Sequence, residues 1–161
     1  MPLPKNNNDL RSSNLGLNSQ KFWKTKTLKQ LTDSEWEALC DGCGKCCLHK
    51  LEDEDTGDIY YTRVACRLLD LNTCRCKNYA ERTQLITDCL DLRKLEPEQY
   101  QWLPNTCAYR LLHEGKKLPR WHPLISKTRH SVEKAGESVK NYAITENDNH
   151  DLEDFIIDWL D

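Results

Sequence analysis

Four cysteines lie within eight residues of this 161-residue chain, in the segment Cys40-Asp-Gly-Cys43-Gly-Lys-Cys46-Cys47. A Cys-x-x-Cys turn directs two sulfur atoms at one ion, and zinc takes four such ligands in tetrahedral geometry. Three sulfurs at this spacing also match the start of a ferredoxin motif. Here the fourth cysteine is adjacent and no proline follows, so an iron–sulfur cluster would need a distant fourth ligand. The segment therefore predicts a metal site.

Further cysteines downstream could complete this site: Cys66, Cys74, Cys76, Cys89 and Cys107. Nine cysteines could serve two four-cysteine sites with one thiol left over, or one site with several buried structural thiols. Neighbouring thiolates repel one another unless a cation neutralises them, so metal binding should lower their pKa values and be coupled to folding. Lys45 either offsets the remaining negative charge or is a solvated lysine.

The composition predicts a reducing environment for these thiols. Residues 1–20 are polar and hold no apolar run typical of a secretory signal, and no stretch approaches the roughly 20 apolar residues that span a bilayer. Thiols stay reduced in the cytoplasm, and an odd number of cysteines fits poorly with a closed disulfide framework. We therefore expect a cytoplasmic protein with no membrane segment, whose cysteines bind metal or carry out redox chemistry.

Charge is unevenly distributed along the chain although the net charge is only −3. The first 30 residues are basic, but the stretch is diffuse and matches no nucleic-acid-binding fold, so we do not expect a nucleic-acid partner. Residues 146–161 contain seven acids and no Lys or Arg. The two ends either attract each other or form solvated surfaces.

Two short elements should position the cysteines. A capping-box pattern at Ser34 and Glu37 predicts a helix that buries Trp36 and Leu39 and ends before the glycines. The runs 47–51 and 59–64 flank a polar loop and predict an antiparallel hairpin. Folding this hairpin brings Cys66 close to Cys43 and Cys46.

Most of the remaining chain favours helices, with apolar and capping patterns over residues 80–95, 97–103, 107–114 and 126–135. Residues 146–161 carry an apolar stripe at helical spacing and predict an acidic amphipathic helix. This helix either docks on the protein's own core or binds a partner. We expect an α-rich small α+β fold, with helices around a short β-hairpin and a Cys-ligated metal centre. Its parts are a flexible arm (1–20), a metal-binding domain (21–145) and the terminal helix (146–161).

Residues outside the cluster define no reaction. His49 could replace a sulfur ligand or face solvent from its strand, and His122 could support the site or simply pack. Arg82 should stack on Tyr79 or donate to cluster thiolates. The sequence contains no Gly-rich phosphate loop and no nucleophile elbow, so it offers no catalytic residues to name.

The segment 40–47, with Cys76-Lys-Asn-Tyr-Ala-Glu-Arg and Cys89 downstream, resembles the CxxCxxCC cysteine-cluster family, a zinc- or iron-chelating domain. The segments Cys107-Ala-Tyr-Arg and Trp121-His-Pro-Leu resemble sequences of its bacterial YcgN-like branch. The likeness runs from about Trp23 to about Val139. It implies metal binding at the seven matching positions, which are Cys40, Cys43, Cys46, Cys47, Cys66, Cys76 and Cys89. Cys74 and Cys107 are further candidates, and Thr83 departs from the family because many members have proline there.

Three functions agree with these patterns. The first is a non-catalytic domain that binds zinc or iron and acts in metal handling or as a scaffold. The second is an iron–sulfur or thiol redox enzyme, in which clustered thiolates carry electrons. The third is an adaptor that binds a protein partner through residues 146–161.

Overall fold

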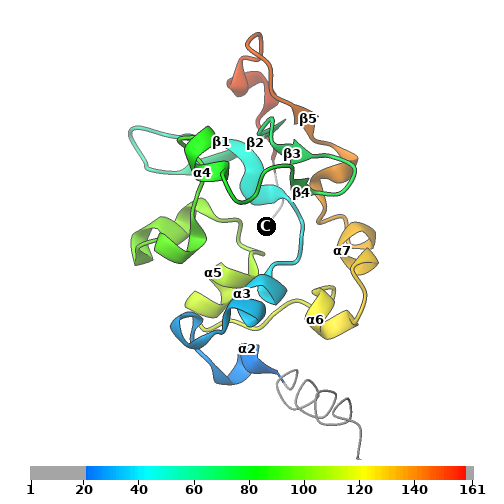
Figure 1. The fold of residues 1–161 in the computed structure, drawn as a ribbon. Helices are drawn as coiled ribbons and strands as arrows, with labels where there is room; N and C mark the ends of the chain where they lie inside the picture. Colours follow the sequence, from blue (N-terminus) through cyan, green and yellow to red (C-terminus); the bar gives the residue numbers. More distant parts are fainter. Residues whose placement is uncertain (1–20, 159–161) are drawn as a thin grey trace, which may run out of the picture.

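The predicted β-hairpin is present and forms two strands of a three-stranded sheet with the order β1-β2-β5 (Figure 1). In the computed structural model, which describes residues 21–158, strand β1 (Leu48–Glu52) pairs antiparallel with β2 (Ile59–Ala65). A short strand, β5 (Ile144–Thr145), pairs in parallel with the end of β2. The β-branched and aromatic residues of β2 suit this half-buried strand, as the sequence indicates.

Short helices near the N-terminus pack with two later helices on the other side of the molecule (Figure 1). They are α2 (Phe22–Thr25), the 3-10 helix η1 (Leu28–Gln30), α3 (Asp33–Leu39), the 3-10 helix η4 (Pro97–Trp102) and α5 (Ala108–His113). Together they bury a hydrophobic cluster centred on Trp36, Leu39, Leu103 and Tyr109. The fold is therefore a small α+β structure, in which each helix spans only one or two turns.

Helix α3 begins slightly earlier than the sequence predicts. Thr32, not Ser34, is the N-cap, and its hydroxyl accepts a hydrogen bond from the Glu35 amide at 3.2 Å. The Glu35 carboxylate in turn accepts from the Thr32 amide at 2.9 Å, which completes a capping box. The predicted burial of Trp36 and Leu39 is confirmed.

Connecting elements surround the cysteines. They are η2 (Lys45–Cys47), β3 (Leu69–Asp70), β4 (Arg75–Cys76), α4 (Arg82–Leu85), η3 (Leu92–Lys94), α6 (Pro123–Ser126), α7 (His130–Lys134) and η5 (Val139–Asn141). The helix predicted over residues 80–95 is wrong. It breaks at Ile86 because Leu92 and Leu95 pack on the N-terminal cluster, while Leu85 stays exposed. The helix predicted over 126–135 is present only as α7.

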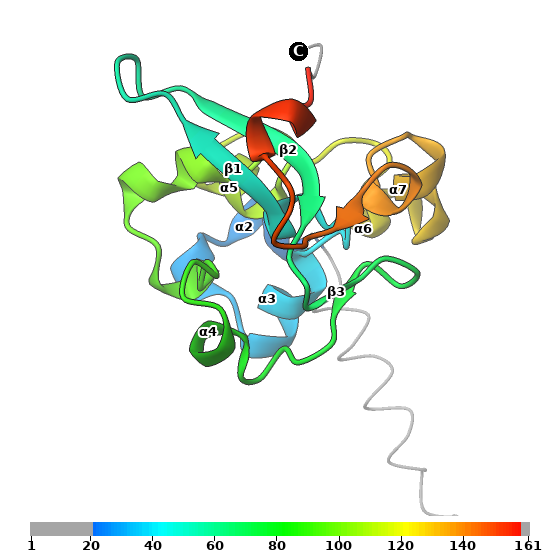
Figure 2. The same cartoon turned by 90° about the horizontal axis from the view of Figure 1, so that it is seen from above.

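The predicted terminal helix is also wrong for the residues described, 146–158. A single 3-10 turn, η6 (Leu152–Phe155), is followed by extended chain, and Ile156 bridges Thr62 in β2. The Ile157 amide donates to the Tyr61 carbonyl at 2.8 Å. Strand β5 pairs only with Val64 and Ala65 at the end of β2. The preceding residues of β2 therefore offer unpaired backbone groups along the same edge. Pairing with that edge replaces helical hydrogen bonds, and Figure 2 shows η6 lying across the hairpin.

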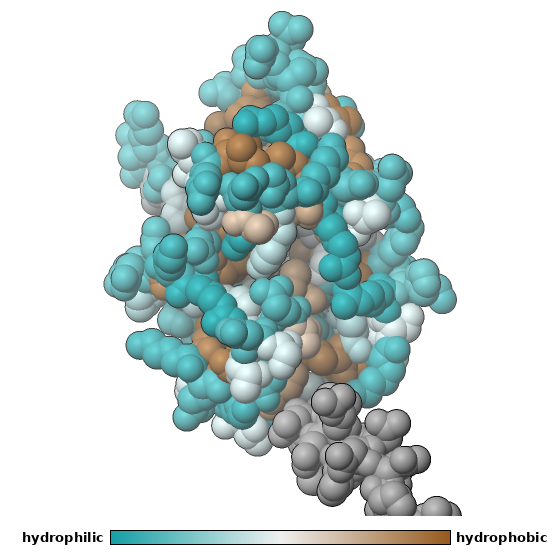
Figure 3. All heavy atoms as spheres, viewed as in Figure 1, coloured by the Kyte–Doolittle hydropathy of each residue, from teal (hydrophilic) through white to brown (hydrophobic). Residues whose placement is uncertain are grey.

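A second hydrophobic cluster lies under the sheet and is built from Leu48, Tyr61, Ala65, Leu69 and Val139. Two small clusters need fewer apolar residues than one large core, because short helices and strands are enough to cover each of them. This explains how a chain with few apolar residues still folds. Hydrophilic residues cover most of the face seen in Figure 3. Among residues 21–158, no helix combines the length and apolar composition that crossing a membrane requires.

Candidate metal-binding cleft

The cysteine loop, residues 40–47, connects α3 to β1 through two left-handed turns. Gly42 has a φ of 74° and Gly44 a φ of 79°, values that glycine adopts without steric cost. At Gly44 a Cβ atom would lie 2.7 Å from the Val139 side chain, so the loop passes close against the second cluster there. The Val139 amide also donates to the Cys43 carbonyl at 2.9 Å. Glycine at position 44 is therefore required for both conformation and packing.

Backbone amides of the loop point at its sulfur atoms. The Gly42 amide donates to Cys40 Sγ at 3.4 Å, and the Lys45 amide donates to Cys43 Sγ at 3.5 Å. The same contact recurs outside the loop, where the Leu68 amide donates to Cys66 Sγ at 3.5 Å. Hydrogen bonds to sulfur stabilise the thiolate form, which is the form that binds metal. Three cysteines are thus held in a backbone setting that suits thiolates.

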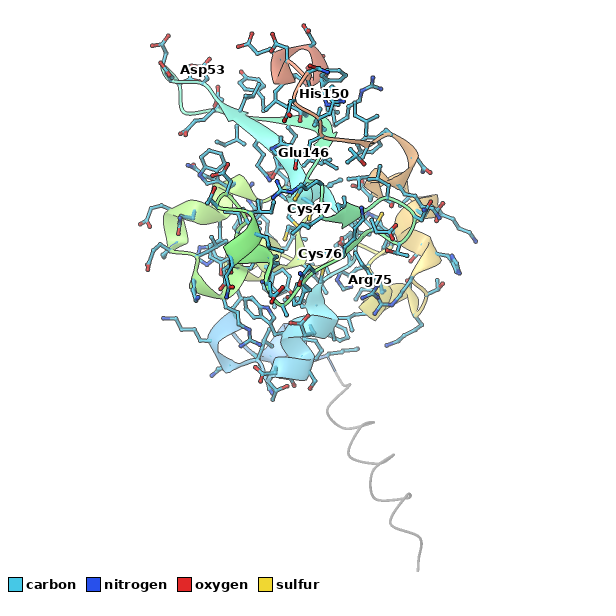
Figure 4. The ribbon with its side chains drawn as sticks, turned by 45° about the horizontal axis from the view of Figure 1, so that its top comes forward. Cys47, Asp53, Arg75, Cys76, Glu146 and His150 are labelled. Carbon is cyan, nitrogen blue, oxygen red and sulfur yellow. The ribbon has the colours of Figure 1, made fainter. Side chains whose placement is uncertain are left out.

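The hairpin brings Cys66 to the loop, as the sequence predicts. Leu48 lies opposite Ala65, and the Cys66 amide donates to the Cys47 carbonyl at 2.8 Å. A second hairpin, in which strands β3 and β4 are two residues each, then places Cys76 opposite Leu69. Figure 4 shows Cys47 and Cys76 near the middle of the molecule. Tertiary pairing of backbone, rather than proximity in sequence, gathers these thiols.

Most of the cysteines line a single cleft of about 1280 Å³. Its walls include Cys40, Cys46, Cys47, Cys66, Cys74, Cys76 and Cys89. Cys43 is buried, and Cys107 packs with Cys46 against the N-terminal hydrophobic cluster. All nine cysteines are free thiols. Among residues 21–158, no three His, Cys, Asp or Glu side chains have the spacing of a formed metal site, so the thiols share a cleft without yet converging on one point.

Burial and mutual repulsion keep several of these thiols protonated. Burial raises the pKa of Cys40 and of Cys107 to about 12, and nearby Cys46 adds to both shifts. Cys40 is itself solvent-accessible, but it lies in the cleft, where surrounding protein desolvates it. Burial also raises the pKa of Cys43, with Asp41 the next cause. A cation in the cleft would reverse these shifts, because it favours the thiolate.

The adjacent thiols Cys46 and Cys47 differ from the others. A hydrogen bond from Cys47 lowers the pKa of Cys46, and the charge of Lys50 adds to this effect against burial. The same hydrogen bond, followed by burial, raises the pKa of Cys47. Lys50 donates to the Cys46 carbonyl at 3.0 Å and to the Leu48 carbonyl at 2.9 Å. Its ammonium group is thus fixed beside the thiol pair.

Lys50 is a cation that acts on the thiols, because its charge adds to the hydrogen bond from Cys47 in lowering the pKa of Cys46. Lys45 is only 6% exposed and its ammonium group forms an ion pair with Glu137, so the interpretation of Lys45 as a solvated lysine is wrong. Burial lowers the pKa of Lys50, while Cys46, Cys47 and Cys89 act to raise it. Sequence reasoning missed Lys50. Its position four residues after Cys46, in the middle of the strand that follows the motif, was the available signal.

Two histidines, His122 and His49, form hydrogen bonds near the cysteine loop, and His49 also lines the cleft. His122 is completely buried; its Nε2 lies 2.8 Å from the Leu39 carbonyl, and its Nδ1 accepts from the Leu124 amide at 3.0 Å. It therefore fixes the residue that precedes Cys40. His49 forms a 2.6 Å contact with Glu146, which in turn accepts from the Arg67 amide at 2.8 Å. Figure 4 places Glu146 above Cys47, whereas Asp53 and His150 lie at the far end of the molecule.

Cys74 and Cys76 have different surroundings. Cys74 has a φ of 53°, lies 3.4 Å from the Ser138 hydroxyl and packs on the second hydrophobic cluster. Cys76 acts electrostatically on Cys66 and Cys89, since it raises the pKa of both, after burial as the main cause. Arg82 stacks on Tyr79, with its guanidinium carbon 4.0 Å from the ring centre, and lowers the pKa of Cys89 against burial. Cys76 therefore lies near Cys66 and Cys89, whereas Cys74 lies against the cysteine loop at Gly44.

Residues 39–108 match the CxxCxxCC family, whose description is "Putative zinc- or iron-chelating domain". Relatives cover nearly the whole chain. A UPF0260 protein of Vibrio atlanticus is 53% identical over 136 residues, which are 84% of this chain and 94% of that protein. Another from Ectopseudomonas mendocina is 54% identical over 133 residues, covering 83% and 89%. One from Klebsiella pneumoniae is 49% identical over 145 residues, covering 90% and 98%.

These matches define a class and a family. The class is the cysteine-cluster domains described as chelators of zinc or iron, which agrees with the resemblance seen in the sequence. Within that class, the chain belongs to the UPF0260 family. No solved structure matches this chain.

Proposed function

We propose that this protein binds zinc or iron through thiolates in and beside the cleft, with Cys40, Cys43, Cys46, Cys47, Cys66, Cys76 and Cys89 as ligands. The observation that supports this most is the meeting of thiols from separate segments of the chain around one cleft. The amides that donate to three of the sulfurs support it further, because a neutral thiol gains little from such donors. The family description is in agreement.

Metal binding by this cleft is coupled to a contraction of the loops around it. The thiols share the cleft but lie farther apart than a bound ion would hold them. Zinc–sulfur bonds are about 2.3 Å long, so a bound ion draws the distal segment, residues 66–90, toward the cysteine loop. Protons leave the thiols as they bind, and the binding free energy becomes folding free energy. This coupling fits a metal-handling protein or a metal-supported scaffold with no reaction of its own.

The test is elemental analysis of protein purified without oxygen, before and after exposure to a strong chelator. We expect a stoichiometric content of zinc or iron, and a lower unfolding temperature after chelation. Protein that contains neither metal, and that has the same unfolding temperature with and without chelator, would contradict the proposal.

The Cys46–Cys47 pair and Lys50 favour a second candidate, an iron–sulfur protein that carries electrons. Hydrogen bonds to sulfur and nearby charge are the means by which proteins set the potential of such clusters. The absorption spectrum separates the two candidates. A brown protein that bleaches on reduction supports the cluster, whereas a colourless protein with stoichiometric zinc supports the non-catalytic function.

A further inference from the structure

Asp41, between the first two cysteines of the loop, carries a buried side-chain oxygen that has no hydrogen-bond partner among the described residues. The residue is 7% exposed, and its Oδ1 accepts a hydrogen bond from the Cys43 amide at 2.9 Å. Its Oδ2 is buried and has no hydrogen-bond partner within residues 21–158. A buried carboxylate oxygen without a partner costs several kcal/mol, by an order-of-magnitude estimate. Such an atom calls for an explanation.

The neighbours of Asp41 make that cost larger. Burial is the main cause that raises the pKa of Cys40, Cys43 and Cys107, and the negative charge of Asp41 raises it further. The same charge opposes the hydrogen bond from Cys47 that lowers the pKa of Cys46, so all four thiols lie near Asp41. The basic side chains nearby are already engaged. Lys45 pairs with Glu137, and His122 uses both ring nitrogens on backbone groups. Thiols that ionise beside this carboxylate would only add negative charge. A bound cation is the group that would make the arrangement favourable.

The remaining cysteines form a separate neighbourhood. Cys66 acts electrostatically on Cys47 and Cys89, and Cys76 acts on Cys66. Backbone pairing joins Cys66 to Cys47 and places Cys76 beside the same short hairpin. Cys46 lies between the two neighbourhoods, since its charge acts on Cys40 and also on Cys89. One tetrahedral ion takes four ligands, and these thiols exceed that number.

We propose that the cleft holds two metal positions, and that Asp41 Oδ2 is a ligand of one of them. The inner set consists of Asp41, Cys40, Cys43 and Cys46, which all belong to the cysteine loop. The outer set consists of Cys47, Cys66, Cys76 and Cys89. The inner position thus has one oxygen and three sulfur donors, which suits zinc or ferrous iron, and the outer one has four sulfurs. This inference rests on the proposed function and adds to it the number of ions and an oxygen ligand.

The loop has room to close on the inner ion. A Cβ atom built at Gly42 would meet no atom within 4 Å, and this residue directly follows Asp41. Small rotations at Gly42 can therefore move the carboxylate relative to Cys43 without a steric penalty. At Gly44, in contrast, packing against Val139 fixes the loop. The end of the loop that carries Asp41 is thus the adjustable one.

Asp41→Asn is the decisive variant. An asparagine keeps the oxygen that accepts from the Cys43 amide and replaces Oδ2 by a nitrogen that does not bind these metals. Asp88→Asn is the matched control, because Asp88 is an exposed carboxylate beside Cys89 on the same cleft. Metal per chain is measured after anaerobic reconstitution with zinc alone. We expect two ions in the unmodified protein and in Asp88→Asn, and one in Asp41→Asn.

Cys66→Ser completes the comparison, since it removes an outer ligand and should also leave one ion. Cobalt(II) reports which position is lost, because its visible bands depend on the donor atoms. We expect Asp41→Asn to lose the bands of the mixed oxygen–sulfur site and Cys66→Ser to lose those of the four-sulfur site. Two ions retained in Asp41→Asn, or one ion both there and in the unmodified protein, would show that Asp41 acts in the turn only. No metal in the unmodified protein would instead overturn the proposed function itself.

Metal-free protein gives an independent measurement that does not depend on loading. Removing an unpartnered buried charge should raise the unfolding temperature of metal-free Asp41→Asn above that of the metal-free unmodified protein. In the zinc-loaded forms the order should reverse, because the variant has lost an ion. A metal-free variant that unfolds at a lower temperature than the unmodified protein would contradict the inference, since Oδ2 would then have a structural role.

Discussion

The cysteine loop (40–47) and the distal segment (66–90) contribute thiols to the same cleft but are stabilised in different ways. The loop is fixed by its own glycine turns, by amides that donate to its sulfurs and by packing of Gly44 against Val139. In the distal segment, β3 and β4 each span two residues and α4 spans four. Tyr79 and Leu85 in this segment are large side chains that remain exposed.

This difference indicates which region depends on metal. A segment with little apolar burial and short elements has low local stability and opens easily. The loop lies between two hydrophobic clusters, so much of its stability comes from packing. We therefore expect metal to order the distal segment more than the loop, although the loop supplies the cysteine motif by which the family is recognised.

The largest effect should follow from breaking the loop itself. Cys43→Ser removes a buried thiol from the inner set and should abolish binding of the inner ion and lower the unfolding temperature strongly. A structural zinc contributes roughly 10–16 kcal/mol of apparent binding energy, of which a large part would be lost. Elemental analysis and thermal unfolding measure both effects. Full metal content with an unchanged unfolding curve would show that Cys43 is not a ligand.

Cys89→Ser should have a smaller effect than Cys43→Ser, and this effect should be confined to the distal segment. It removes an outer ligand from the distal segment, so hydrogen exchange should increase over residues 66–90 while the cysteine loop stays protected. Hydrogen exchange with mass spectrometry, on metal-loaded protein, measures the two regions in one experiment. Equal increases in both regions would mean that the loop and the segment open as one unit.

A smaller effect is expected at His122, which supports the loop from outside. His122→Ala leaves the Leu39 carbonyl and the Leu124 amide without their partner and opens a cavity, at a cost of roughly 2–4 kcal/mol. His130→Ala is the control, because His130 is exposed and should cost about 0.5 kcal/mol or less. Urea unfolding gives both values. Similar stabilities of the two variants would show that His122 does not stabilise the cysteine loop.

Sequence reasoning predicted the parts of the site whose signal is local. The motif at residues 40–47 and the alternating runs on either side of the polar loop were sufficient for the helix α3, the hairpin and the approach of Cys66. Each of these depends on neighbouring residues and on one antiparallel turn. The small α+β class follows from the same local signals.

The two wrongly predicted helices have a common physical cause, because contacts with distant parts of the chain outweigh the local helical pattern. The stripe at residues 152–160 has helical spacing, yet the free edge of β2 offers Ile156 and Ile157 backbone partners that no pattern in the sequence records. Residues 80–95 divide for a similar reason, because Leu92 and Leu95 have a core to join and Leu85 does not. Asp41 and Lys50 were missed as parts of the site because their roles depend on burial and on the arrangement of the folded loop and hairpin.

The two loop glycines offer a matched pair of small perturbations. Both have positive φ, so alanine at either position should cost roughly 1 kcal/mol in backbone strain. Gly44→Ala should cost about 1–3 kcal/mol more, because its Cβ would lie 2.7 Å from the Val139 side chain, whereas Gly42→Ala meets open space. Chemical denaturation of the metal-free proteins measures the difference. Equal losses at the two positions would show that the loop is not fixed by packing at Gly44.

The smallest effect concerns pH and separates His122 from the thiols. Burial lowers the pKa of His122 below its usual 6.5, and Leu39 and Asp41 oppose this only in part. The unfolded chain therefore binds a proton more readily than the folded one, so this stability is present above about pH 6.5 and is lost as the pH falls through the folded pKa. The loss cannot exceed about 1.4 kcal/mol per pH unit. Metal-free protein must be used, since protons also compete with metal for thiolates. In His122→Gln the pH dependence between about pH 6.5 and 5 should become flatter, and an unchanged slope would assign it to another group.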